Sequence, residues 1–202
     1  MHKAGAALVA MICWAGLAVQ FSATYGNQHN VGATLWVLAR FFTILTNLLV
    51  ALAMTMVATG RKVSPFVLGG LTLAILLVGA VYATLLQGLH ELRGPAVVAD
   101  ILLHTVSPAA MVPWWLLFAP KKALKWSAPV QWAAYPLAYF AYVLGRAQID
   151  HRYPYPFVDV TKLGWVQTLI NAGGIAMAFI IAGFVLVWID SWRPLGSGRS
   201  SR

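Results

Sequence analysis

Apolar runs long enough to cross a membrane recur along this chain and constrain its fold more than any other feature. The clearest runs from Ala96 to Phe118. A helix needs roughly 20 mostly apolar residues to span a bilayer. Further runs reach or approach that length at about residues 4–23, 34–58, 66–86, 130–144 and 165–189. The sequence therefore predicts an all-α, polytopic integral membrane protein with six transmembrane helices in one bundle.

The composition agrees with a membrane protein. Hydrophobic residues make up 60% of the chain and charged residues 9%, which is atypical of a soluble domain. The net charge of +9 would suit a nucleic-acid partner, but the basic residues are scattered between the apolar runs. Loops that orient a membrane protein explain them better, so no nucleic-acid partner is expected. The single cysteine, Cys13, excludes an intrachain disulfide and a cysteine-based redox or zinc site.

The chain is predicted to form one transmembrane domain, residues 1–193, followed by a short polar cytoplasmic tail, residues 194–202. The first apolar run has a rival interpretation as a signal peptide, because Lys3 precedes it and the small residues Ser22 and Ala23 end it. Its length favours a retained span.

The distribution of Lys and Arg predicts the orientation. Nine of these residues flank one set of predicted helix ends and four flank the other. The set of nine is Lys3, Arg61, Lys62, Lys121, Lys122, Lys125, Arg193, Arg199 and Arg202, and the set of four is Arg93, Arg146, Arg152 and Lys162. Because positive residues accumulate in cytoplasmic loops, both termini are predicted to be cytoplasmic.

Two ionisable residues lie inside the run from Ala96 to Phe118. Asp100 and His104 are four residues apart, so on a helix they share one face. Ionisable groups at membrane depth are costly and usually mark a functional site. The alternative is structural, with Asp100 bonding His104 only to hold two helices together.

A second polar strip lies in the predicted helix over residues 34–58. Arg40, Thr43 and Asn47 are spaced three and then four apart, which places them on one face of a continuous helix. A membrane threonine usually bonds its own backbone one turn back, and an asparagine often joins helices. Arg40 has two open roles, snorkelling outward or pairing with Asp100.

The two strips are expected to meet. At a rise of 1.5 Å per residue, Thr43 lies about 13 Å and His104 about 10 Å below the same membrane surface. The two side chains are therefore predicted to face each other across a polar cavity in the outer half of the membrane.

A hydroxyl, an imidazole and a carboxylate together have the parts needed for nucleophilic acyl transfer. Thr43 would be the nucleophile, His104 its base and Asp100 the group that orients the imidazole. Arg40 or Asn47 would stabilise an oxyanion or hold an anionic headgroup. The chain has neither an HExxH nor a GxSxG motif, and its other histidines lie near helix ends or in loops. No metal and no cofactor are expected.

Three short motifs carry a resemblance to a known family. They are Arg40–Thr43, His104–Pro108 and Tyr155–Phe157. In this order they resemble the androgen-induced family of intramembrane threonine hydrolases and its bacterial six-span relatives. The resemblance implies a hydrolase of fatty acid esters of hydroxy fatty acids in the bacterial inner membrane, with the nucleophile at Thr43 and its histidine partner at His104. The chain departs from the animal members in having Asp100 where they have an amide.

Two functional hypotheses follow. The first is a threonine-dependent hydrolase of lipid or fatty acyl esters. The second is a non-enzymatic protein that binds or transports a lipid or small molecule, with the same polar strips holding a headgroup. The oligomeric state stays open.

Overall fold

The structure is a computed structural model that describes residues 1–89 and 91–192. All regular secondary structure in this part of the chain is helical. The elements are α1 (His2–Gln28), α2 (Val31–Leu38), α3 (Phe42–Ala58), α4 (Pro65–Val81), the π-helical turn η1 (Tyr82–Leu86), α5 (Pro95–Ile101), the π-helical turn η2 (Leu102–Val106), α6 (Ser107–Phe118), α7 (Ala128–Trp132), α8 (Ala134–Asp150), the 3-10 turn η3 (Pro156–Val158) and α9 (Val160–Ser191). The predicted all-α class is confirmed, whereas the predicted tail at residues 194–202 lies outside the described residues.

Within the described residues, four helical segments are long and apolar enough to cross a membrane. They are His2–Gln28, Pro65–Leu86, Pro95–Phe118 and Val160–Ser191. α2 and α3 together are also long and apolar enough to cross a membrane, but they meet at an angle of 98°. The expectation of one continuous helix over residues 34–58 is therefore wrong. The predicted span at residues 130–144 coincides with parts of α7 and α8, which are not among these segments.

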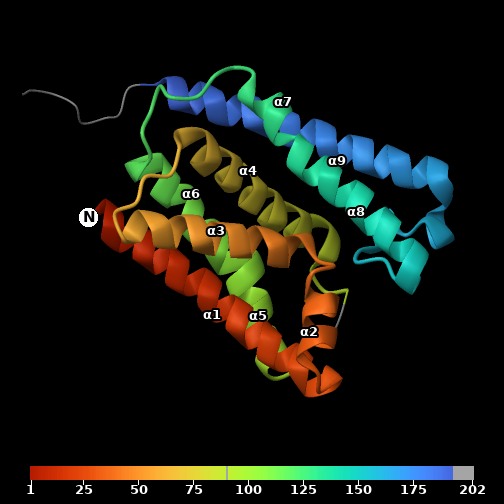
Figure 1. Cartoon of the computed structure of the whole chain (residues 1–202). Helices are drawn as coiled ribbons and strands as arrows, with labels where there is room; N and C mark the ends of the chain where they lie inside the picture. The colour runs from red at the N-terminus through yellow and green to blue at the C-terminus, as the bar shows by residue number, and fades with distance from the viewer. Residues whose placement is uncertain (90, 193–202) are drawn as a thin grey trace, which may run out of the picture.

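The helices pack in two groups that share α4. α1 packs along α3, α5 and α6, and α4 contacts α3, α6 and α9. α7 and α8 lie beside α9, so α4 separates them from α1 (Figure 1). Between the helices lie fully buried side chains such as Met54, Ile75 and Met111. α1 approaches η2 closely at Gly16, where an added Cβ would come within 2.7 Å of Leu103.

The N-terminus and the C-terminal end of α9 lie at the same end of the molecule (Figure 1). The connection after α6 reaches this end as well, since the Lys122 amide donates to the Asp190 carbonyl at 2.9 Å. The indole of Trp114 donates to the His2 carbonyl at 3.0 Å and joins α6 to the start of α1. The bend between α2 and α3 lies at the opposite end (Figure 1).

Candidate functional site

Thr43 and His104 come together in the structure, although 61 residues separate them in the chain. The Thr43 hydroxyl lies 3.1 Å from His104 Nε2. Thr43 belongs to the first turn of α3, and His104 lies in η2. The hydroxyl and the imidazole are thus within the reach that a nucleophile–base pair needs.

Asp100 holds the other nitrogen of the imidazole. His104 Nδ1 lies 2.9 Å from the Asp100 carboxylate and 3.1 Å from the Asp100 backbone carbonyl. A backbone carbonyl can only accept, so Nδ1 carries the proton and Nε2 is left free to accept one. The polar chain therefore runs from Thr43 through His104 to Asp100, which is the order of a catalytic triad.

Tyr82 completes this chain, and the sequence analysis did not identify it. The Tyr82 hydroxyl donates to the second carboxylate oxygen of Asp100. Its ring also stacks on His104, with centroids 4.4 Å apart and an interplanar angle of 18°. Tyr82 begins η1, at the end of an almost purely apolar run, where a lone phenol was the only available signal.

The bend between α2 and α3 frees the Thr43 hydroxyl. Thr55 and Thr72, farther inside helices, donate to the carbonyls four residues back, at 2.7 and 2.8 Å. Thr43 cannot do the same along a continuous helix, because Ala39 lies on the other side of the bend. The usual inert arrangement of a membrane threonine is absent here, and His104 takes the place of the backbone carbonyl.

A proline explains the π-helical turn that carries His104. Pro108 lies four residues after His104 and has no N–H to donate to the His104 carbonyl. The Ser107 amide bonds instead to Leu102, five residues back. The Leu103 carbonyl, which the Ser107 amide would reach in a regular α-helix, accepts instead from the Ser107 hydroxyl at 3.0 Å. π-Helical turns of this kind often occur at functional sites.

Asn47 ties α3 to this turn. Its amide nitrogen donates to the Thr43 carbonyl at 2.9 Å and to the Leu103 carbonyl at 3.1 Å. Asn47 is fully buried. Its contacts therefore fix the distance between the helix that bears Thr43 and the turn that bears His104.

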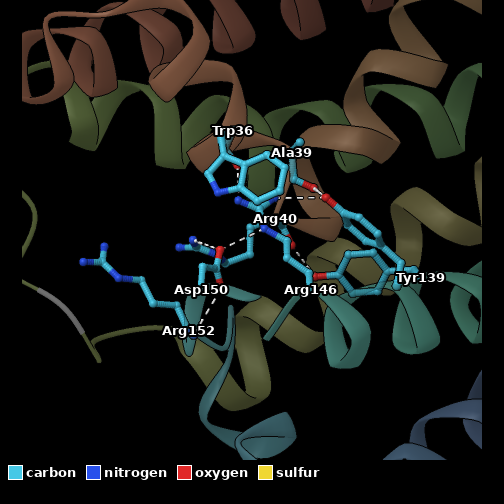
Figure 2. Close-up of polar contacts among 8 residues, drawn as sticks. Trp36, Ala39, Arg40, Tyr139, Arg146, Asp150 and Arg152 are labelled. Atoms are coloured by element: carbon cyan, nitrogen blue, oxygen red, sulfur yellow. Dashed lines mark hydrogen bonds and ion pairs between the residues drawn. The ribbon is translucent and has the colours of Figure 1, made fainter. Parts of the chain in front are cut away.

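Arg40 does not share a helix face with Thr43 and Asn47, because it lies in the bend. Its guanidinium donates to Asp150 at 2.7 Å, and not to Asp100 (Figure 2). Arg146 donates to the same oxygen of Asp150 at 3.1 Å. The pairing of Arg40 with Asp100 was one of two roles left open by the sequence, and the structure contradicts it.

Side chains of α8 hold the bend in place. Tyr139 donates to the Arg40 carbonyl at 2.8 Å and Tyr142 to the Ala39 carbonyl at 3.2 Å, so carbonyls left over at the end of α2 find donors. Arg146 also covers the Trp36 ring, with its guanidinium carbon 4.0 Å from the ring centroid (Figure 2).

The charge on Asp150 is strongly favoured. Its carboxylate pairs with the guanidinium groups of both Arg40 and Arg146, at 2.7 and 3.1 Å. Asp150 is one of only five acidic residues in the chain, so few partners were available for a deep arginine. The ion pair therefore persists at any pH near neutrality.

Tyr155 closes the site from the connection between α8 and α9. Its ring packs edge-on against Phe41 and stacks on Phe157, with centroid distances of 6.2 and 5.2 Å. Burial raises the pKa of its phenol, and the neighbouring Thr43 hydroxyl opposes that shift. The connection between α8 and α9 therefore brings an aromatic ring to the nucleophile.

Two cavities adjoin the site. The first, which we call the Phe179 cavity, is lined by α4, α8 and α9 and by Thr43. It contains about 750 Å³ of space free of protein atoms, part of which is open to the surroundings. Its lining is almost entirely aliphatic and aromatic, with residues such as Val78, Phe140 and Ala176.

The second, which we call the His104 cavity, contains about 840 Å³ of space free of protein atoms, again partly open. Gln20, Tyr82 and Asp100 line it together with His104. Thr43 lines both cavities. Arg40 and Asn47 line neither, so of the five predicted site residues the structure brings three, Thr43, Asp100 and His104, to a common cavity.

In the part of the chain that the structure describes, no three His, Cys, Asp or Glu side chains gather closely enough to hold a metal ion. Comparisons with family models, with curated proteins and with solved structures find no match to this chain.

Proposed function

We propose that this protein is an intramembrane hydrolase of lipid esters, with Thr43 as nucleophile, His104 as general base and Asp100 as the group that orients the imidazole. The observation that carries the proposal is the hydrogen bond between the Thr43 hydroxyl and His104 Nε2. A threonine inside a helix can bond the backbone carbonyl one turn back, whereas the Thr43 hydroxyl bonds an imidazole. Here the imidazole is also held on its other nitrogen by a carboxylate, as activation of a hydroxyl requires.

The chemistry runs in two halves. Thr43 Oγ bonds to the ester carbonyl carbon as its proton passes to His104 Nε2. The bond between that carbon and the alcohol oxygen then breaks, and the proton on Nε2 passes to the departing alcohol. Water attacks the acyl-threonine in the same way, giving one proton to Nε2, and the fatty acid leaves as Thr43 Oγ recovers that proton.

The first turn of α3 is suited to stabilise the oxyanion. Amides at a helix N-terminus lack intrahelical acceptors, and the side chain of the N-cap residue Phe41 does not cap α3. The helix dipole favours negative charge at this end. We assign the backbone N–H groups of Phe42 and Thr43, which the Tyr155 phenol faces in this structure, as the donors to the developing oxyanion once the ester displaces that phenol. Thr43 would then supply both the nucleophile and part of the oxyanion hole.

For the membrane arrangement we propose six spans in one bundle, in a bacterial inner membrane, with both termini cytoplasmic. α2 and α3 together would form the second span, and α7 and α8 the fifth. Support comes from the nine-to-four distribution of Lys and Arg and from the shared end at which the N-terminus and the C-terminal end of α9 lie (Figure 1). The site would then open toward the outer leaflet.

Cysteine labelling tests this orientation. A membrane-impermeant maleimide applied to intact cells should modify a cysteine at position 152 (Arg152→Cys) and leave one at position 125 (Lys125→Cys) untouched. Both native side chains are exposed, and the native Cys13 is buried and should contribute little background. The reverse pattern would invert the proposed topology and move the site to the inner leaflet.

A fluorophosphonate probe tests the hydrolase itself. The probe should become covalently attached to Thr43, with loss of fluoride, because only an activated hydroxyl reacts with it. Mass spectrometry of the labelled peptide locates the adduct, and heat-denatured protein serves as the unreactive control. If folded protein takes up no label at Thr43, the site lacks an activated nucleophile and the lipid-binding or transport hypothesis replaces this one.

A further inference from the structure

The two cavities differ in chemistry, and they meet at the proposed nucleophile. Among the described residues that line the Phe179 cavity, none carries a charge, and its polar groups are only Thr43, Tyr139 and Tyr155. The His104 cavity is more polar, because Gln20, Tyr82, Asp100 and His104 all line it. Thr43, Tyr155 and Leu86 are common to both linings. An ester bound at the Thr43 hydroxyl would therefore extend one arm into each cavity.

The proton route decides which arm enters which cavity. His104 Nε2 takes the proton from Thr43 and must return it to the alcohol oxygen that leaves. That oxygen has to lie within hydrogen-bond reach of Nε2, on the side of Thr43 where His104 lies. The alcohol arm consequently extends into the His104 cavity, and the acyl chain extends into the Phe179 cavity, which Thr43 also lines.

We propose that the Phe179 cavity is the acyl-chain site and the His104 cavity the alcohol site, so that α9 sets the length of fatty acyl chain that the protein accepts. This assignment rests on the proposed function. The uncharged lining of the Phe179 cavity excludes a carboxylate or a phosphate from the acyl arm, because an unpaired charge there would be strongly disfavoured. The substrate class is therefore an ester whose acyl arm is apolar to its end.

One face of α9 offers a sharp test. Ala172 and Ala176 line the Phe179 cavity, whereas Ala178 is exposed on another face of the same helix. Ala176→Phe should fill the cavity without touching the Thr43–His104 pair, and Ala178→Phe adds the same side chain outside it. The measurement is kcat/KM for a series of p-nitrophenyl esters from acetyl to palmitoyl, in purified full-length protein.

Ala176→Phe should lower kcat/KM for the long-chain esters by about tenfold or more and leave the acetyl ester within about twofold of wild type. Ala178→Phe should preserve the whole profile. Ala172→Leu provides a second, smaller obstruction in case Ala176→Phe fails to fold. If the dependence of kcat/KM on acyl-chain length is unchanged in both Ala176→Phe and Ala172→Leu, the assignment is overturned. The proposed function still stands in that case, provided that hydrolysis depends on Thr43.

A binding measurement separates this inference from the proposed function. A fatty ester with a diazirine at the end of its acyl chain should photolabel residues that line the Phe179 cavity, even in Thr43→Ala, and Ala176→Phe should remove that labelling. If the photolabelling follows this pattern but the protein hydrolyses no ester, the hydrolase is refuted and the acyl-chain site is retained. Labelling that is unchanged in Ala176→Phe would refute the acyl-chain site.

Discussion

Replacing Thr43 with alanine is expected to lower ester turnover by about 10³-fold or more while the protein stays folded. The substitution removes the hydroxyl that is bonded to His104 Nε2. The cost to stability should be only about 1 kcal/mol, the value of a hydrogen bond inside a membrane protein. Ester hydrolysis and thermal unfolding of the purified variant measure the two effects separately.

Two further variants control this experiment. Thr43→Ser keeps a hydroxyl at the same position and should retain measurable turnover. Thr72→Ala removes the same atoms from another buried threonine, but that hydroxyl bonds its own helix at 2.8 Å. It should leave turnover unchanged. Full activity in folded Thr43→Ala would show that Thr43 is not the nucleophile.

Replacing His104 with alanine is expected to cause a loss as large as that of Thr43→Ala, because a hydroxyl without a base is a poor nucleophile. The double variant should lose no more than either single variant, since two residues that act as one unit give strongly non-additive effects. Single-turnover kinetics of the three variants provide the test. Losses that simply multiply would show that Thr43 and His104 act independently and would contradict the nucleophile–base assignment.

Asp100→Asn separates orientation from proton transfer. His104 Nδ1 also donates to the backbone carbonyl of residue 100, a contact that the substitution leaves in place. The imidazole should therefore keep its tautomer, and turnover should fall much less than in His104→Ala. A loss equal to that of His104→Ala would assign the Asp100 carboxylate a larger part than orientation.

Local properties of the chain were enough to predict the helical class and several membrane-length segments. The run at residues 96–118 became the continuous segment Pro95–Phe118, because a helix of given length spans a given thickness whatever its neighbours are. The meeting of Thr43 with His104 was also predicted, but the depth of Thr43 had been counted along a continuous helix that the bend at residues 39–41 breaks. Pro108, four residues after His104, was available as a signal of the π-helical turn, since a proline removes a helical hydrogen bond wherever it occurs.

The bend at residues 39–41 was decided only by the tertiary structure. The segment 34–58 is apolar enough for one helix, and nothing local interrupts it. The groups that hold the bend, Tyr139, Tyr142 and Asp150, belong to α8, and Asp150 is 110 residues from Arg40 in the chain. The same bend frees the Thr43 hydroxyl for His104. The sequence by itself therefore determined which residues were available for the site, because helix length and polarity are local. Only the tertiary structure decided that Arg40 pairs with Asp150 and that Tyr82 joins Asp100, because contacts between distant helices supply the donors and counter-charges that a broken helix requires.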